Sequence, residues 1–303
     1  MKQKPKVLSL RKRISQQKML LLMVLPGFIW YVVFKYLPML GLSLAFTDYG
    51  FRAKVSFIGL KNFHRLLTST IFWNAFRNTL VISLMNIVFY FPCPIIVALL
   101  INELKNFKVQ KAIQFVIYVP YFFSWVVVGS VFVNLLSPES GPINAIIKAL
   151  GHEPIYFMAS VTYFRSVIVS SYIWRQMGYG AVIYIAALTT IEPQLYEAAT
   201  IDGAGRWQQL WNVTLPSLRP TIVTMLLLNL AHVLLIFEQI LVMYNSAVYD
   251  VADVLQTYVY REGVLSGDIG YSVAVGMFTS LISLFLVLST NKLSSRFLEE
   301  PIL

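Results

Sequence analysis

Six long apolar segments dominate this sequence and restrict its fold more than any other feature. A helix needs roughly 20 mostly apolar residues to cross a bilayer. The chain is 57% hydrophobic and only 13% charged, whereas soluble domains carry about 25% charged residues. The sequence therefore predicts an all-α integral membrane protein with six transmembrane helices. The six segments cover residues 19–46, 76–101, 113–136, 164–189, 219–245 and 271–291.

Basic residues indicate how these helices are oriented. Lys and Arg are concentrated in the N-terminal tail, in the loops after the second and fourth segments, and in the C-terminal tail. Because such residues accumulate on the cytoplasmic side of a membrane, we expect both tails, residues 1–18 and 292–303, to be cytoplasmic around a transmembrane domain of residues 19–291. The same topology explains the net charge of +10, so we expect no nucleic-acid partner.

The N-terminal basic run followed by an apolar segment is also typical of a signal peptide. However, Pro26, Trp30 and Lys35 interrupt the apolar segment, and no small-residue cleavage site follows it. An uncleaved first span is the interpretation that fits these residues better.

The loop between the fourth and fifth segments, residues 190–216, is the most informative stretch of the chain. Pro193 suits the first turn of a helix, where its missing N–H would have no partner in any case. Gly203 and Gly205 allow a sharp turn, and residues 207–213 can form a second short helix before Pro216. The sequence predicts a small helical knob that docks a partner, with an ordinary connecting loop as the alternative.

The residues of this loop also follow a family pattern. Glu197-Ala198-Ala199, Gly203 and Leu215-Pro216 are spaced in a way that resembles the EAA motif of binding-protein-dependent ABC importer permeases. Val213 stands where that family commonly has Ile. Further segments resemble the sugar permeases of this family, of the MalF-like and LplB-like type. These segments are 57–63, 72–79, 141–144, 174–178 and 196–204.

The resemblance implies a type I importer architecture, MetI/MalF-like, in the bacterial cell membrane. It implies that the chain is a transport subunit for a sugar or oligosaccharide and not an enzyme. ATP and magnesium would bind to partner ATPase subunits, and this chain would carry no cofactor. The implied partners are a second homologous permease, two cytoplasmic ATPase subunits, an extracellular or periplasmic solute-binding protein and the lipid bilayer. The implied ATPase-coupling residues are Glu197, Ala198, Ala199, Asp202, Gly203, Leu215 and Pro216.

Polar residues inside apolar segments are costly and tend to face a cavity or a partner. Asn229, His232 and Gln239 share one face of a helix over 219–245, because they are three to four residues apart with Ile236 between them. We expect this face to contact the transported sugar, with hydrogen bonding between helices as the alternative. Glu238, a further candidate for the sugar passage, lies on another face, nearer the external end. Trp174 is a candidate for stacking on a sugar ring, with packing as its alternative.

Three cations in or beside the apolar segments suggest a sharper hypothesis. Some of Lys35, Arg165 and Arg175 would attract an acidic oligosaccharide, such as one that contains uronate. For Lys35 and Arg165 the alternative is that the side chain extends along the apolar surface to reach the polar interface.

Several other functions lack their sequence signatures. The chain has no G-x-x-x-x-G-K-[ST] motif for phosphate binding and no H-E-x-x-H metal motif, so we expect neither an ATPase site nor a metal site in it. A secondary transporter or channel that works alone would not need the knob at 190–216. An intramembrane enzyme would need a nucleophile and a base, and no such arrangement is recognisable.

Overall fold

The computed structural model describes residues 17–51, 55–232 and 234–298, and side chains as far as Lys292. Most of the two predicted tails therefore lies outside the described residues. Within the described part the chain is helical, and the one β-type contact is an isolated bridge between Thr47 and Phe57. The helices of the N-terminal half are α2 (Lys18–Tyr31), η1 (Val32–Tyr36), η2 (Leu37–Phe46), α3 (Lys61–Thr68), α4 (Thr70–Met85), η3 (Asn86–Tyr90), α5 (Pro92–Asn102), α6 (Phe107–Tyr118), η4 (Val119–Phe122), α7 (Trp125–Leu135) and α8 (Pro142–Ala149).

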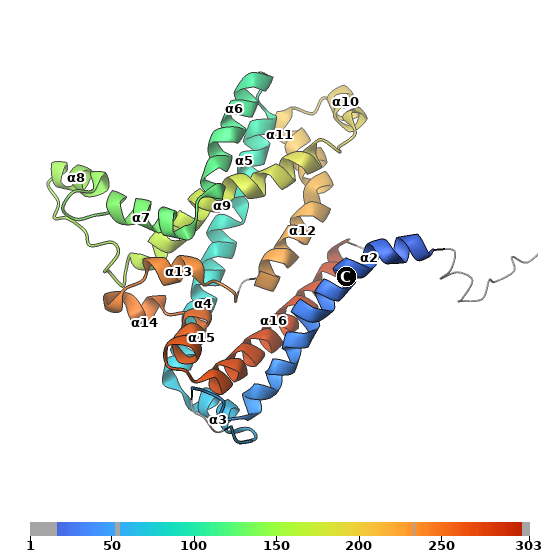
Figure 1. Cartoon of the computed structure of the whole chain (residues 1–303). Helices are drawn as coiled ribbons and strands as arrows, with labels where there is room; N and C mark the ends of the chain where they lie inside the picture. The colour runs from blue at the N-terminus through green and yellow to red at the C-terminus, as the bar shows by residue number, and fades with distance from the viewer. Residues whose placement is uncertain (1–16, 52–54, 233, 299–303) are drawn as a thin grey trace, which may run out of the picture.

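The C-terminal half begins with α9, an uninterrupted helix of 25 residues. Its helices are α9 (Phe164–Leu188), α10 (Pro193–Ile201), α11 (Arg206–Gln209), η5 (Leu210–Thr214), α12 (Leu215–His232), α13 (Glu238–Met243), η6 (Ser246–Val248), α14 (Tyr249–Ala252), α15 (Leu255–Tyr260), η7 (Arg261–Leu265) and α16 (Ile269–Leu298). Figure 1 shows the α10–α11 pair at one end of the molecule and α3 with α15 at the opposite end.

Four helical stretches of the described chain are long and apolar enough to cross a membrane. A pair of helices joined by a bend would make a fifth if the pair is counted as a single span. The four stretches are Lys18–Phe46, Thr70–Asn102, Arg206–His232 and Ile269–Lys292. Helix α9 has 25 residues and matches the predicted segment 164–189, but Arg165, Arg175 and Gln176 make it less apolar. The helical class is confirmed, whereas the count of six spans stays a prediction.

Two predicted spans are interrupted, which the apolar pattern did not indicate. The third, 113–136, bends by 102° between Phe107–Phe122 and Trp125–Leu135. The prediction of one helix over 219–245 is wrong, because α12 ends at His232 and a separate short helix, α13, begins at Glu238. Asn229 and Gln239 therefore do not share one helix.

Helix α9 is the central packing element, and small residues let its neighbours approach it. It lies against α5, α6 and α12. At Gly178 an added Cβ would collide with the backbone of Ile117 in α6, and at Gly180 it would meet the ring of Pro94 at 2.7 Å. Near the knob, Ala181, Tyr184 and Leu188 of α9 form an apolar cluster with Ala98 and Leu218.

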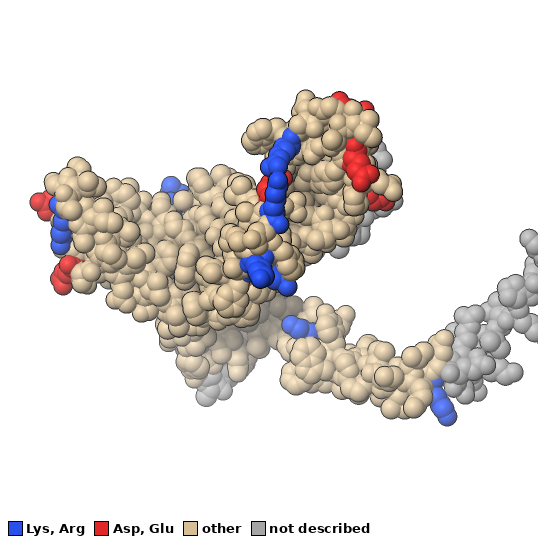
Figure 2. All heavy atoms as spheres, turned by 90° about the horizontal axis from the view of Figure 1, so that it is seen from above, with Lys and Arg blue, Asp and Glu red and all other residues tan. Residues whose placement is uncertain are grey.

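The outer surface is largely uncharged. Helix α2 has no buried residue, and η2 joins it to the rest of the chain by packing on α16. On the face drawn in Figure 2, Lys, Arg, Asp and Glu occupy a few places, and broad surfaces between them carry no charge. Such a surface suits hydrocarbon or a partner subunit better than water, because large exposed apolar patches are rare in soluble monomers.

Candidate functional site

The knob at residues 190–216 forms as the sequence predicts in most respects. Pro193 opens α10 at its first turn, and Gly203 has a φ of +80°, a backbone conformation that favours glycine. The expectation that Gly205 also needs glycine's freedom is wrong, because its φ is −72°. The second helix also does not end before Pro216: α11, η5 and α12 run on without a break.

Side-chain hydrogen bonds hold α10 on the helix that follows it. The hydroxyls of Tyr196 and Thr214 lie 3.0 Å apart. The side-chain amide of Gln209 donates to Thr200 Oγ1 at 2.9 Å, and Gln208 Oε1 accepts from the backbone N–H of Gly205 at 2.8 Å. The first two bonds link α10 to η5 and α11, and the third caps the N-terminus of α11, so the knob has a defined shape of its own.

The knob exposes large apolar side chains, and its charged residue Arg206 pairs with Glu103 at 3.5 Å. Ile201 is 86% exposed and Trp207 72% exposed. Glu197, one turn before Ile201 on α10, is exposed and takes part in none of the ion pairs of the described chain. An exposed carboxylate beside large apolar side chains is the composition of a docking surface rather than of a loop in water.

The other predicted coupling residues lie on or beside this knob. Ala198 and Asp202 are exposed on α10 and at its C-terminus, and Ala199 is half-buried. Leu215 and Pro216 are the first residues of α12. The knob therefore brings the seven residues implied by the motif into one region of the chain.

A small pocket lies between α4–α5, α9 and α12, and it contains two of the predicted pathway residues. Asn229, His232 and Ile236 form one wall, and Asn86, Tyr90 and Tyr172 contribute to the others. The space that water can fill is about 60 Å³, whereas small-molecule sites commonly measure roughly 300–1,000 Å³. The pocket can therefore be only part of a site for an oligosaccharide.

Asn86 is the pocket residue that the sequence reasoning missed. It stands at the start of the π-helical turn η3, is 8% exposed, and its Oδ1 has no hydrogen-bond partner. In contrast, Asn229 donates to the carbonyl of Met225 at 2.8 Å. A buried amide oxygen without a partner costs free energy, so Asn86 is suited to accept from a sugar hydroxyl or from water. The signal was available, because Asn86 is a polar residue inside an apolar segment, as Asn229 is.

Three further pathway candidates lie elsewhere. Gln239 is 2% exposed, and its side-chain amide donates to Ile168 O at 2.6 Å and to Ser171 Oγ at 2.9 Å. It thereby fixes α13 on α9 and does not line the pocket. Glu238 is exposed in the first turn of α13, and Trp174 packs against Phe132 with ring centroids 6.0 Å apart.

Two of the three candidate cations, Lys35 and Arg165, differ in their surroundings. Lys35 is exposed on η1. Arg165 donates from Nε to the carbonyl of Val251 at 3.1 Å and from Nη2 to Asn78 Oδ1 at 2.7 Å. These bonds join α9 to α4 and α14, so they favour a structural role for Arg165 over a contact with substrate.

Replacing Arg165 with methionine tests this assignment. We expect the assembled complex to lose about 2 kcal/mol of stability, because a charged donor is removed from two acceptors. Thermal unfolding of the purified complex measures the loss. Arg77→Met is the matched control, since Arg77 is an exposed cation in neighbouring α4. Equal stability of the two variants would contradict the structural role.

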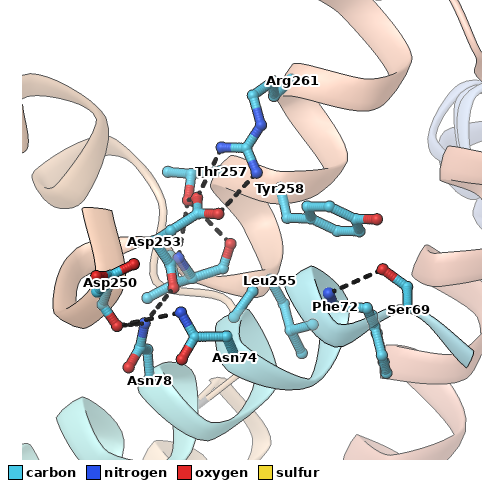
Figure 3. Close-up of polar contacts among 12 residues, drawn as sticks. Ser69, Phe72, Asn74, Asn78, Asp250, Asp253, Leu255, Thr257, Tyr258 and Arg261 are labelled. Carbon is cyan, nitrogen blue, oxygen red and sulfur yellow. Dashed lines mark hydrogen bonds and ion pairs between the residues drawn. The ribbon is translucent and has the colours of Figure 1, made fainter. Parts of the chain in front are cut away.

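A polar cluster, drawn in Figure 3, fixes the helices around α15, which lies opposite the knob in Figure 1. The carboxylate of Asp253 accepts from the guanidinium of Arg261 at 2.7 and 3.0 Å and from Thr257 Oγ1 at 2.7 Å. Asn78 donates to the carbonyls of Asp250 and Asp253. The hydrogen bond with Asp253 raises the pKa of Arg261 above its ordinary value. The cluster ties α14, α15 and η7 to α4.

A second ionic group lies close to this cluster. Arg65 of α3 pairs with Asp268 and with Glu262, the latter at 3.4 Å, and stacks over the ring of Tyr271. Burial lowers the pKa of the Arg65 guanidinium, but the hydrogen bond to Asp268 and the charges of Asp268, Tyr271 and Glu262 together outweigh it and raise that pKa. Within the described residues, no group of three or more His, Cys, Asp or Glu side chains is placed to hold a metal ion.

Comparison with known proteins places this geometry in context. Residues 91–299 match the model of a family described as "Binding-protein-dependent transport system inner membrane component". The chain is 42% identical over 295 residues to a polygalacturonan/rhamnogalacturonan transport system permease protein, YteP, of Bacillus subtilis, covering 96% of this chain and 92% of that protein. It is 39% identical over 292 residues to protein LplB of the same organism, covering 95% and 92%.

Solved structures give the same likeness at the level of the fold. A bacterial ABC transporter involved in the import of the acidic polysaccharide alginate contains a chain that matches with a TM-score of 0.89 and 38% identity, over 95% of this chain and 99% of that one. The alginate transporter in complex with an alginate pentasaccharide-bound periplasmic protein matches with a TM-score of 0.91 and 38% identity, over 97% and 99%.

Proposed function

Because the chain belongs to the family of binding-protein-dependent transport system inner membrane components, we propose that it is a permease subunit for oligosaccharides that contain uronate. The chain is a transport subunit of an ABC importer of the bacterial inner membrane and lacks an ATPase site of its own. It works beside a second permease, ATPase subunits and a solute-binding protein.

The substrate class is inferred from the likeness to the alginate importer, which extends along nearly the whole chain at 38% identity and a TM-score of 0.91. The relative described as a polygalacturonan/rhamnogalacturonan permease, at 42% identity, supports it independently. Alginate and polygalacturonan are both polymers of uronic acids. The three proteins would therefore share an anionic carbohydrate as cargo.

The knob and the pocket support a mechanism in which an ATPase subunit docks on the permease and the sugar passes along the pocket. The exposed apolar face of α10 and α11, with Glu197 on it, would dock on an ATPase subunit, where ATP and magnesium bind. The pocket with Asn86, Asn229 and His232 would be one wall of the passage. At about 60 Å³ it is too small for an oligosaccharide, so the second permease would complete the passage.

The test is transport by the complete complex in proteoliposomes, with its solute-binding protein supplied outside. We expect accumulation of trigalacturonate that requires both ATP and the binding protein, and much less accumulation of maltotriose. Accumulation without ATP, or an equal rate with maltotriose, would overturn the proposal.

A further inference from the structure

Arg175 is a cation near the middle of α9, which has 25 residues. At 1.5 Å per residue it lies about 16 Å along the helix, and the hydrocarbon core of a bilayer is roughly 30 Å thick. Within the predicted span 164–189, a charge at this depth is costly unless it faces a cavity or a partner group. The contacts of the Arg175 guanidinium therefore indicate its role.

The protein holds the guanidinium of Arg175 in place but leaves part of it free. Nε donates to the carbonyl of Phe123 at 2.9 Å. The guanidinium carbon lies 4.7 Å from the ring centroid of Trp125 and 5.5 Å from that of Tyr121. Within the described residues, no carboxylate pairs with Arg175, and its two terminal nitrogens make no hydrogen bond. Two parallel N–H donors thus remain available in a fixed orientation.

Aromatic rings connect this guanidinium to the pocket described above. Trp125 stacks on Tyr172 with centroids 6.2 Å apart, and Tyr172 lines the pocket beside Asn86. On the other side, Tyr121 stacks on Tyr179 at 4.2 Å with the rings 7° from parallel. The pocket and the cation therefore lie along one strip formed by α9 and the bend between α6 and α7.

The chemistry of this strip fits one class of ligand. The two free N–H groups of a guanidinium match the two oxygens of a carboxylate, whereas the buried ring of Trp125 and the stacked ring of Tyr121 hold the guanidinium in place. A uronate residue supplies such a carboxylate. Arg165 offers no comparable site, because two of its nitrogens are already bonded within the protein.

We propose that Arg175, oriented by Phe123 O and by the rings of Trp125 and Tyr121, binds the carboxylate of a uronate residue during its passage through the permease. This inference rests on the proposed function and adds to it a specificity-determining residue. The competing explanation is that Arg175 only ties the bend between α6 and α7 through Nε. A purely structural role would affect acidic and uncharged cargo equally.

The experiment compares uptake of trigalacturonate with uptake of its carboxyl-methylated form in proteoliposomes that contain the whole complex and its binding protein. The ratio of the two initial rates is the readout, because defects in assembly or in ATP hydrolysis cancel in it. For Arg175→Gln we expect the ratio to fall about tenfold or more, since a hydrogen-bonded charge pair is lost. For Arg77→Gln, an exposed cation on α4, we expect the wild-type ratio.

Arg175→Lys serves as the second variant, and it decides the question if Arg175→Gln does not assemble. Lysine keeps the charge but lacks the planar pair of donors, so its ratio should lie between those of the wild type and Arg175→Gln. If the wild type transports trigalacturonate and both Arg175 variants keep its ratio, the inference fails while the proposed function stands. If the wild type does not transport trigalacturonate at all, the proposed function fails and the inference fails with it.

Discussion

Glu197→Ala is expected to reduce ATP-driven uptake at least thirtyfold while the permease itself still folds. The carboxylate is exposed on α10, so its removal breaks no internal ion pair. If it pairs with a basic group of the ATPase, the pair is buried on docking, and truncating one member of such a pair costs about 2–5 kcal/mol, which corresponds to roughly thirtyfold or more in binding. Uptake and ATPase activity of the reconstituted complex measure the loss.

Two further variants make this result specific. Glu139→Ala removes an exposed carboxylate that lies between α7 and α8, far from the knob, and should leave uptake near the wild-type level. Glu197→Gln keeps the size of the side chain and should retain more uptake than Glu197→Ala but less than the wild type. Wild-type uptake and ATPase activity in Glu197→Ala would refute the coupling role.

Gly178→Ala is expected to prevent assembly of a stable complex. The added Cβ would collide with the carbonyl of Ile117 and approach the backbone of Tyr118. Backbone atoms cannot rotate away as a side chain can, so α9 and α6 would have to separate. We expect a loss of about 3 kcal/mol or more, at the upper end of the usual cost of overpacking.

The yield and melting temperature of the purified complex measure this loss. Gly27→Ala is the matched control, because Gly27 also lies within a helix but has no atom within 4 Å of the added Cβ. Normal assembly of Gly178→Ala would mean that the two helices are not packed as closely as the structure has them.

Much of the fold followed from local chemistry that the sequence displays. Apolar length indicated the long helices, Pro193 marked the start of α10, and Gly203 marked the turn that its φ of +80° requires. Asn229 and His232 could be paired because they lie one turn apart on the same helix. In each case neighbouring residues in the sequence decide the structure.

The interruptions of the third and fifth predicted spans had different origins. The bend between α6 and α7 had a local signal, because Pro120 precedes it and Ser124 Oγ accepts from the backbone N–H of Val127 as an N-terminal cap of α7. The end of α12 at His232 had none, since no proline or glycine lies between His232 and Glu238. There the hydrogen bonds of Gln239 to α9 stabilise a separate α13, and such distant contacts cannot be read from apolar periodicity.

The site residues that belong to one spaced motif were predictable from the sequence, whereas the roles of the cations were not. The knob residues were found together because one spaced pattern contains them. Lys35, Arg165 and Arg175 could not be told apart as candidates, since a sequence does not tell which cation has its donors occupied. Only the bonds of Arg165 to Val251 and Asn78 and the single bond of Arg175 separate their roles.

The unbroken course of α9 has a mechanical consequence. One end of this helix is anchored through Arg165 to α4 and α14, and the other end leads within a few residues to the knob. The long stretches Lys18–Phe46, Thr70–Asn102 and Arg206–His232 each contain a π-helical turn, η1, η3 and η5, whereas α9 is regular over its 25 residues. Helix α9 therefore joins the polar contacts of Arg165 to the knob without a change in its hydrogen-bond pattern, and we expect it to move as one rigid rod when the knob is displaced.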